Sequence, residues 1–329
     1  MAYIANNGRY DKMEYRRCGR SGLKLPAMSL GLWHNFGTDA PYTNCREMIL
    51  GAFDLGITHF DLANNYGPLP GSAEETFGRV LSEDLKFYRD EIIVTTKAGY
   101  DMWPGPYGDH GSRKYLIASL DQSLKRMKLD YVDIFYHHRP DPETPLEETM
   151  GALRDIVQSG KALYVGISNY SPEDTRKAID MLNDMGVHCL IHQMRYSMLD
   201  CSNDSVLSVL EEKGVGAIAY SPLKQGILTG KYLNGIPEDS RAHGHSQFLK
   251  ESSLTPEVME TTRKLKEIAD KRGDTLSHMA LAWVLAQKQM ASVILGARNL
   301  EQIKDNLKAL ECAPFSDEEN RTIDSLIRK

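Results

Sequence analysis

The chain has 329 residues, of which 41% are hydrophobic and 26% charged, a mixture typical of a globular protein with a substantial core. This composition excludes a disordered chain, and a net charge of −6 without a long basic run gives no sign of a nucleic-acid partner. Five cysteines without a C-x-x-C pair predict reduced thiols. With no signal peptide and no apolar run of membrane-spanning length, we expect a cytoplasmic protein without a membrane segment.

The first predicted element is a β-hairpin over about residues 13–26, which is suited to plug one end of a barrel. Short apolar runs then predict eight strands, at Ala27–Gly31, Thr58–Asp61, Glu91–Lys97, Val132–His138, Ala162–Ser168, Cys189–Gln193, Gly216–Tyr220 and Ser292–Leu295. Apolar residues that recur every three or four positions predict helices at Asn44–Leu55, Arg113–Met127, Leu146–Gln158, Pro172–Met185, Val206–Lys213 and Leu300–Leu310.

Strands this short and apolar suit a parallel sheet covered by helices, and eight strand–helix units predict an α/β fold with one (β/α)8 TIM barrel across residues 1–329. Two features depart from a plain eightfold repeat. A long loop over about residues 223–253 is interpreted as a ligand clamp, and two helices, Pro256–Lys271 and Thr275–Gln287, precede the last strand. A further C-terminal helix, with a capping-box-like start at Ser316, runs to Ile327.

Polar residues lie at, or shortly after, the carboxyl ends of the second, third and fourth predicted strands, which meet at the mouth of a barrel. Asp61, Tyr66, Lys97 and His138 are these residues. Hydride addition to a carbonyl leaves an alkoxide that needs a proton, and a phenol such as Tyr66 delivers one if a cation lowers its pKa. Lys97 is the predicted cation, Asp61 would hold Lys97 charged, and a neutral His138 would polarise the carbonyl oxygen.

The same residues lie in strings with a family resemblance. Phe60–Gly67, Thr95–Lys97 and Tyr131–Asp141 look like the three catalytic segments of the aldo-keto reductase superfamily, and the resemblance spans nearly the whole chain. It implies a reductase that transfers a hydride from a nicotinamide nucleotide to a carbonyl carbon. In that reaction Tyr66 would be the proton donor.

Neither glycine-rich string is a dinucleotide or phosphate-loop motif: Gly214–Ala219 runs into a strand, and Gly226–Tyr232 lacks the Ser/Thr after Lys231. The family resemblance instead implies a nicotinamide site that comprises Trp33, Asp61, Ser168, Asn169, Gln193 and Tyr220. It further implies a pyrophosphate site at Ser221, Leu223, Gln225, Gly226, Lys231 and Arg241, and an adenosine site at Gly296, Arg298, Gln302, Asp305 and Asn306. Arg241 and Arg298 favour NADPH over NADH.

Three further strings, Gly31–Gly37, Gly99–Gly108 and Gly111–Tyr115, narrow the resemblance. Two branches of the superfamily are similar to the chain, the potassium-channel β-subunits and, by these strings more closely, the bacterial L-glyceraldehyde 3-phosphate reductases. The predicted substrate residues are Trp33, Tyr66, Trp103 and His138, with Arg113, Lys114 and Arg139 as partners for a substrate phosphate. They indicate a three-carbon phosphorylated or dicarbonyl aldehyde, such as L-glyceraldehyde 3-phosphate or methylglyoxal. Alternatively, Arg113 and Lys114 are solvated at a helix start, and Arg139 pairs with Asp133 or Asp141.

Other functions remain as alternatives. Lys97 at a strand end would suit a Schiff-base aldolase, although a neighbouring Asp61 favours the protonated amine. A second alternative is a nucleotide-binding regulatory subunit with incidental turnover, as the resemblance to channel β-subunits suggests. We expect no metal: His188 and His192 have no evident third ligand, and His243 and His245 belong to the predicted cofactor-clamp loop. A homo-oligomer, a tetramer or larger, is implied by the resemblance.

Overall fold

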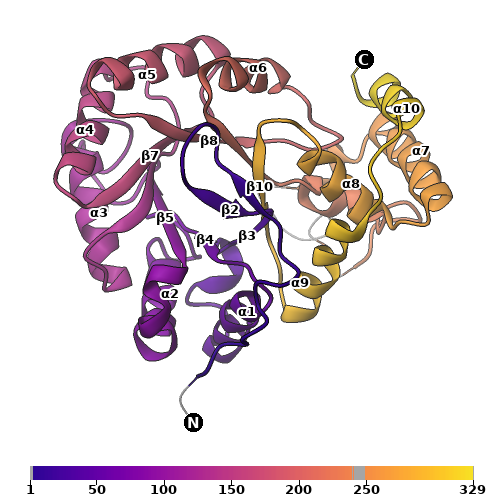
Figure 1. The fold of residues 1–329 in the computed structure, drawn as a ribbon, viewed down its shortest axis with the longest axis horizontal. Coiled ribbons are helices and arrows are strands. Elements are labelled where there is room, and N and C mark those ends of the chain that lie inside the picture. Colours follow the sequence, from indigo (N-terminus) through magenta and orange to yellow (C-terminus); the bar gives the residue numbers. More distant parts are fainter. Residues whose placement is uncertain (1–2, 239, 241–248, 329) are drawn as a thin grey trace.

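The computed structural model describes residues 3–238, 240 and 249–328. Eight parallel strands form a closed barrel in which hydrogen-bonded neighbours follow chain order, and the last strand returns to the first (Figure 1). These strands are β3 (Met28–Gly31), β4 (His59–Asp61), β5 (Ile93–Ala98), β6 (Val132–His137), β7 (Ala162–Ser168), β8 (Cys189–Arg195), β9 (Gly216–Tyr220) and β10 (Met290–Leu295). Every strand overlaps a predicted range, so the predicted (β/α)8 barrel is confirmed.

Helices surround the barrel because each presents an apolar face to the strands. They are α1 (Tyr42–Asp54), α2 (Ser72–Val80), α3 (Arg113–Met127), α4 (Leu146–Gln158), α5 (Pro172–Asp184), α6 (Asp204–Lys213), α8 (Leu276–Leu285) and α9 (Leu300–Leu307). Sequence periodicity missed α2, which is short and contains Gly78. A Cβ at this position would lie 2.4 Å from the carbonyl oxygen of Arg126, so glycine allows α2 to approach the end of α3 closely.

The predicted hairpin is formed by β1 (Tyr15–Arg17) and β2 (Lys24–Pro26), which pair antiparallel. Its turn lies at the N-terminal ends of β8 and β9: the amide of Arg20 donates to the carbonyl of Gly214 at 2.8 Å. Gly19 permits this approach, because a Cβ there would lie 2.3 Å from the same oxygen. Cys18 and Leu25 are fully buried in the cluster that fills the barrel interior. The hairpin therefore closes the floor of the barrel, as the sequence suggested.

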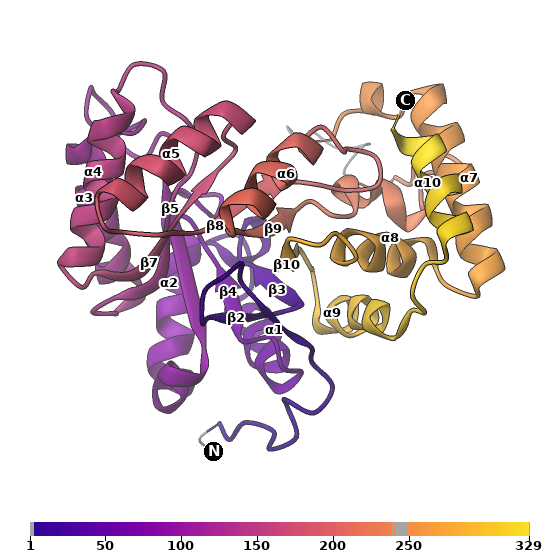
Figure 2. The same cartoon turned by 45° about the horizontal axis from the view of Figure 1, so that its top comes forward.

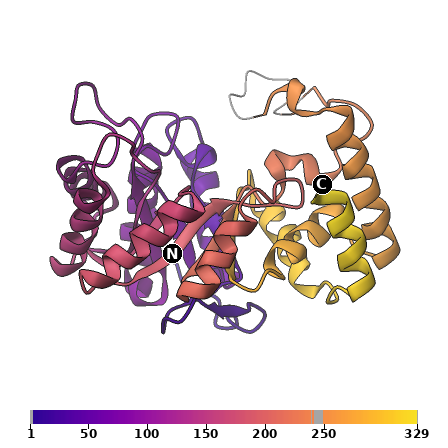
Figure 3. The ribbon, with the colours of Figure 1, turned by 90° about the horizontal axis from the view of Figure 1, so that it is seen from above.

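Between β9 and β10 the chain contains α7 (Pro256–Arg272) and then α8, the two helices that the sequence predicted. Figures 2 and 3 show α7 beside α10 (Asp317–Ile327) at the flank of the barrel, outside α8. The predicted capping box starts α10 at Ser316. In the described parts of residues 223–253, Ile227, Tyr232 and Leu249 form a small buried cluster, so these parts pack against the protein.

All five cysteines are free thiols, in agreement with the prediction of no disulfide. Across residues 3–238, 240 and 249–328, no helix is both long and apolar enough to cross a membrane. The main apolar core lies between the strands and the helices that cover them. A second, smaller apolar cluster lies in the barrel interior, next to the floor that the hairpin closes.

Candidate active site

The strand ends bring three of the four predicted catalytic residues together by register. Asp61, the last residue of β4, pairs with Thr95 on β5, and Ala98, which follows Lys97, pairs with His137 at the end of β6. Asp61, Lys97 and His138 are all buried. The fourth, Tyr66, lies on the loop after β4, with its ring centroid 4.9 Å from Nζ of Lys97 and 5.9 Å from the ring of His138.

Lys97 is held from two sides. Its Nζ donates to Oδ2 of Asp61 at 2.7 Å and to the carbonyl oxygen of Leu62 at 2.5 Å. Burial lowers the pKa of Lys97 from its usual value, and the neighbouring Asp61 opposes that decrease. The predicted ion pair is therefore present, but burial rather than Asp61 sets the direction in which the pKa moves.

The pKa of Tyr66 moves in the direction opposite to the predicted one in this structure. Burial, reinforced by the negative charge of Asp61, raises the pKa of Tyr66 well above its usual value of 10.0. The phenol was expected to become more acidic beside a cation, but desolvation of its anion has the largest effect on the pKa and acts in the opposite direction. The hydroxyl of Tyr66 thus stays protonated at neutral pH and retains the proton that an alkoxide would take.

His138 was predicted to be neutral, and the structure agrees. Burial lowers its pKa well below the usual 6.5, and the positive charge of Lys97 contributes further. Among the described residues, its buried Nδ1 has no hydrogen-bond partner. The ring of Tyr100, which the sequence analysis did not select, packs edge-on against His138 at 4.6 Å.

A buried chain of hydrogen bonds supports Asp61 from below. Its Oδ1 accepts from Oγ1 of Thr95 at 2.9 Å, and Nε2 of His59 lies 3.2 Å from that hydroxyl. Because Thr95 donates its only hydroxyl proton to the carboxylate, His59 must donate from Nε2. This series of hydrogen bonds ends at Ser29 and Ser292. The hydroxyl of Ser29 lies 2.8 Å from Nδ1 of His59 and 2.6 Å from the Ser292 hydroxyl.

The sequence analysis did not predict these hydrogen bonds, although the spacing of the residues along the strands indicates them. His59 lies two residues before Asp61 on β4, and Thr95 lies two residues before Lys97 on β5. Side chains two residues apart on a strand share one face, so both point into the barrel interior beneath the catalytic pair. Burial lowers the pKa of His59 to about 4, which keeps its ring neutral.

Two residues predicted for the nicotinamide, Gln193 and Asn169, contact the catalytic residues directly. Gln193 donates from Nε2 to Oδ1 of Asp61 at 2.9 Å. Asn169 donates from Nδ2 to the carbonyl of His138 at 3.1 Å and to Ser168 at 3.0 Å, and accepts from the Tyr220 hydroxyl at 2.9 Å.

The predicted pyrophosphate residues form a tight turn after β9. Ser221, Lys224, Gln225 and Gly226 all have positive φ angles, between 47° and 93°. Nε2 of Gln225 donates to the Ser221 hydroxyl at 3.0 Å, and Leu223 is half-buried between them. A Cβ at Gly226 would lie 3.3 Å from Nζ of Lys231, so this ammonium lies against the turn.

Arg241, with His243 and His245, lies outside the described residues.

At the predicted adenosine site, Arg298 is exposed and precedes α9. Its amide donates to Oε1 of Gln302 at 2.9 Å. Gly296 is exposed, with no atom within 4 Å of where its Cβ would lie. Asn306 is buried, and Asp305 is 3.0 Å from Nζ of Lys308. The open backbone at Gly296 lies at the end of β10, on the same rim of the barrel as Tyr220.

The two tryptophans predicted to contact substrate have different surroundings. Trp33 lies beside Tyr66, with ring centroids 6.2 Å apart, whereas Trp103 packs against Tyr115 of α3 at 5.2 Å. The hydroxyl of Tyr115 donates to the carbonyl of Tyr100 at 2.5 Å and so ties the loop after β5 to that helix.

The three predicted phosphate partners already have contacts. Arg113 forms an ion pair with Asp155 that joins α3 to α4 in the outer helix layer. Nζ of Lys114 lies over the exposed ring of Tyr107, 5.3 Å from its centroid. These two side chains are therefore not directed at the catalytic residues in this structure.

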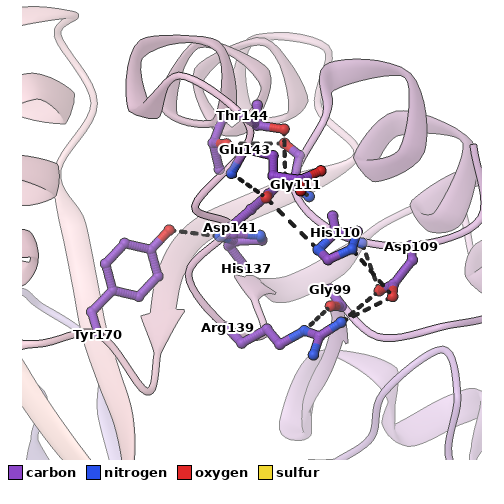
Figure 4. Close-up of polar contacts among 11 residues, drawn as sticks. Gly99, Asp109, His110, Gly111, His137, Arg139, Asp141, Glu143, Thr144 and Tyr170 are labelled. Carbon is purple, nitrogen blue, oxygen red and sulfur yellow. Dashed lines mark hydrogen bonds and ion pairs between the residues drawn. The ribbon is translucent and has the colours of Figure 1, made fainter.

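Arg139 holds two loops together, as Figure 4 shows. Its Nη2 donates to both carboxylate oxygens of Asp109 at 2.9 and 3.0 Å, and its Nε donates to the carbonyl of Gly99 at 2.6 Å. The alternative partners Asp133 and Asp141 are wrong: Asp133 pairs with Arg89 at 2.9 Å, and Asp141 accepts from the amide of Gly111. Arg139 thus links the loop after β5 to the strand end that carries His138.

No group of three or more His, Cys, Asp or Glu side chains within residues 3–238, 240 and 249–328 is arranged to hold a metal ion. His192 is fully buried and accepts a hydrogen bond from the amide of Tyr170, whereas His188 is exposed and contacts Asn183. The two histidines therefore do not face one another across a shared site.

The sequence matches one protein family over nearly its whole length. Residues 27–328 match the model of the aldo/keto reductase family. The chain is 56% identical to an L-glyceraldehyde 3-phosphate reductase of Escherichia coli K12, over 99% of this chain and 96% of that protein. It is 36% identical to a probable voltage-gated potassium channel subunit beta of Arabidopsis thaliana, over 92% and 93% of the two chains. A putative subunit of the same kind from Schizosaccharomyces pombe is 37% identical, over 94% and 92%.

Proposed function

Because the chain belongs to the aldo/keto reductase family and is an oxidoreductase of carbonyl groups, we propose that it reduces small aldehydes to alcohols with NADPH. The proposed substrates are L-glyceraldehyde 3-phosphate, after the E. coli relative, and methylglyoxal-like aldehydes. One observation carries the proposal: the buried Lys97–Asp61 ion pair lies under the ring of Tyr66, beside a neutral His138. This group can deliver a proton to a carbonyl oxygen.

NADPH, when bound, supplies the hydride that forms the new C–H bond at the carbonyl carbon. The electron pair of the C=O π bond then moves to the oxygen, and Tyr66 gives this oxygen its hydroxyl proton. The ammonium of Lys97, fixed by Asp61, stabilises the resulting phenolate until it regains a proton from solvent. The imidazole of His138, neutral at physiological pH, donates a hydrogen bond that orients the carbonyl oxygen. Aldehyde, NADPH and one proton thus give alcohol and NADP⁺.

The strand ends fit the nucleotide. Asn169 and Gln193 offer amide groups for the carboxamide, and the ring of Tyr220 offers a stacking surface beside them. The absence of a Cβ at Gly226 leaves room for a phosphate next to the Lys231 ammonium. The exposed Arg298 favours NADPH over NADH, because a guanidinium pairs well with a 2′-phosphate.

The test is NADPH oxidation by purified protein with a panel of short aldehydes, including methylglyoxal and both enantiomers of glyceraldehyde 3-phosphate. Tyr66→Phe is the matched variant, because it removes only the hydroxyl. We expect the variant to bind NADPH and to lose about 10²–10⁴-fold in kcat, the usual contribution of a general acid. Nucleotide binding without turnover of any aldehyde would contradict the proposal and favour the regulatory-subunit alternative, which the relatives named as channel subunits suggest.

The Schiff-base alternative has its own test, because burial lowers the pKa of Lys97 in the direction that an amine nucleophile needs. Borohydride treatment in the presence of aldehyde would trap a lysine adduct, detectable as a mass increase. We expect none, since Nζ already donates to Asp61 and to the Leu62 carbonyl.

The free thiols agree with a cytoplasmic location. We further propose a homo-oligomer, a tetramer or larger, which light scattering would measure.

A further inference from the structure

Arg195 is a cation at the mouth of the barrel that sequence reasoning did not select. It is the last residue of β8, two positions after Gln193, and it pairs in register with Tyr220 on β9. Its side chain is 56% exposed. Because Gln193 contacts Asp61, Arg195 lies on the same rim of the barrel, one step above the catalytic group.

Arg195 acts electrostatically on Tyr220. Burial raises the pKa of Tyr220, and the neighbouring charge and hydrogen-bonding group of Arg195 oppose that increase. The hydroxyl of Tyr220 in turn donates to Asn169, which donates to the carbonyl of His138. A short series of polar contacts thus connects the guanidinium to the end of β6.

Arg195 shares its carboxylate partner with another cation. Its ion-pair partner among the described residues is Asp200, with Nη1 3.9 Å from Oδ2. The same oxygen accepts from Nζ of Lys224 at 2.7 Å, so Lys224 is the closer partner. Lys231 adds a third cation beside the turn at Gly226. Arg195 and Lys224 thus share the carboxylate of Asp200.

The cations first predicted for a substrate phosphate are engaged in a different way. Arg113 is held by Asp155 in the outer helix layer, and Arg139 binds both oxygens of Asp109. The ion pair of Arg195 is longer than either of these, with 3.9 Å between Nη1 and Oδ2 of Asp200. A guanidinium with free donors in a planar fork is suited to bind two oxygens of a phosphoryl group.

We propose that Arg195 binds a phosphoryl group at the mouth of the barrel and so determines which anionic ligands the site prefers. The proposal rests on the proposed reductase function for its two sources of phosphate, the phosphorylated aldehyde and the pyrophosphate of the nucleotide. A phosphoryl group at this position would supply the negative charge that the rim over β8 and β9 lacks. Its negative charge would also hold the Arg195 side chain at the rim beside Tyr220.

The experiment compares wild type with Arg195→Met, which keeps the length of the side chain and removes its charge. Arg176→Met is the matched control, since Arg176 pairs with Glu212 on the outer helices α5 and α6. We would measure kcat/KM for glyceraldehyde 3-phosphate and for unphosphorylated glyceraldehyde, and the Kd of NADPH by fluorescence. Melting temperatures of the three proteins would establish that each is folded.

If the substrate supplies the phosphate, Arg195→Met lowers kcat/KM at least about tenfold for the phosphorylated aldehyde and leaves glyceraldehyde unchanged. If the nucleotide supplies it, the Kd of NADPH rises by a similar factor and both aldehydes are affected equally when NADPH is subsaturating. Values for Arg195→Met that match those of Arg176→Met on all three measurements would overturn the proposal. Calorimetry with inorganic pyrophosphate tests Arg195 independently of turnover: equal affinity of wild type and Arg195→Met would also overturn it, whereas an inactive wild type would contradict only the reductase function.

Discussion

The hydroxyl of Thr95 donates a 2.9 Å hydrogen bond to Oδ1 of Asp61, the carboxylate whose other oxygen binds the catalytic Lys97. Thr95 lies two residues before Lys97 on β5, and both side chains point to the same face of the strand. Both residues therefore contact Asp61 from β5. The position of the ammonium therefore depends on a side chain that never contacts substrate. Thr95 is a positioning residue in this scheme.

Thr95→Val keeps the shape of the side chain and removes this hydrogen bond. A hydrogen bond to a charged group contributes roughly 1.5–3 kcal/mol, so we expect kcat to fall about tenfold or more while the KM for NADPH changes little. Thr95→Ser restores the hydroxyl and should recover most of the rate. Equal loss in the serine and valine variants would show that packing, rather than the hydrogen bond, is responsible.

The Asp109–Arg139 ion pair holds the loop between β5 and α3, which carries Tyr100 and Trp103 (Figure 4). Asp109→Asn removes its charge, and partly exposed pairs of this kind contribute up to about 1 kcal/mol. We expect the KM for aldehyde to rise roughly fivefold, with a smaller change in kcat. Steady-state kinetics would measure both values. Asp101→Asn, at an exposed position of the same loop, is the control, and an equal effect there would refute a specific role for the ion pair.

Arg113→Met tests the original interpretation of the helix start. The structure places this guanidinium against Asp155, between α3 and α4, so we expect kcat/KM for glyceraldehyde 3-phosphate to stay within about twofold of wild type. A modest decrease in melting temperature would accompany the loss of the ion pair. A selective loss of activity with phosphorylated aldehydes would instead restore Arg113 as a substrate ligand.

Buried histidines make stability depend on pH. Burial lowers the pKa of His192 to about 3 and those of His59 and His137 to about 4, below the usual value of 6.5. Between these values the unfolded chain binds more protons than the folded protein, so the free energy of unfolding falls as pH drops below about 6.5. Each such histidine costs roughly 1.4 kcal/mol per pH unit in that range.

His192→Gln should therefore reduce the loss of stability between pH 7.5 and pH 5 by about 2 kcal/mol, while the glutamine oxygen can still accept from the amide of Tyr170. Urea unfolding at the two pH values measures this difference. His188→Gln is the control, because His188 is exposed. An identical pH dependence for wild type and His192→Gln would show that His192 is not held neutral.

Much of the fold could be predicted because the strands are short apolar runs, and β4, β5 and β6 have polar residues at their carboxyl ends. Asp61, Lys97 and His138 were identified by that pattern, and the register of β4, β5 and β6 brings them together. The helix α2 was missed because Gly78, which its packing against α3 requires, interrupts the apolar period.

Side-chain direction was harder to predict. Arg113 and Arg195 look alike in the sequence, as single arginines at the edge of an element, yet one contacts the outer helices and the other lies at the barrel mouth. The direction of the Tyr66 pKa could not be predicted either, because it depends on how completely the folded protein removes water from the phenol.

The hairpin that closes the barrel floor has a consequence for the order of assembly. Its docking partners lie far along the chain: Arg20 binds Gly214, and Arg16 donates to the carbonyl of Leu285 at 2.7 Å. The hairpin is synthesised before both partners, so its docking surface is incomplete until residues near 285 have been synthesised. We therefore expect the hairpin to dock late in synthesis and the floor of the barrel to be among the last parts of the protein to form.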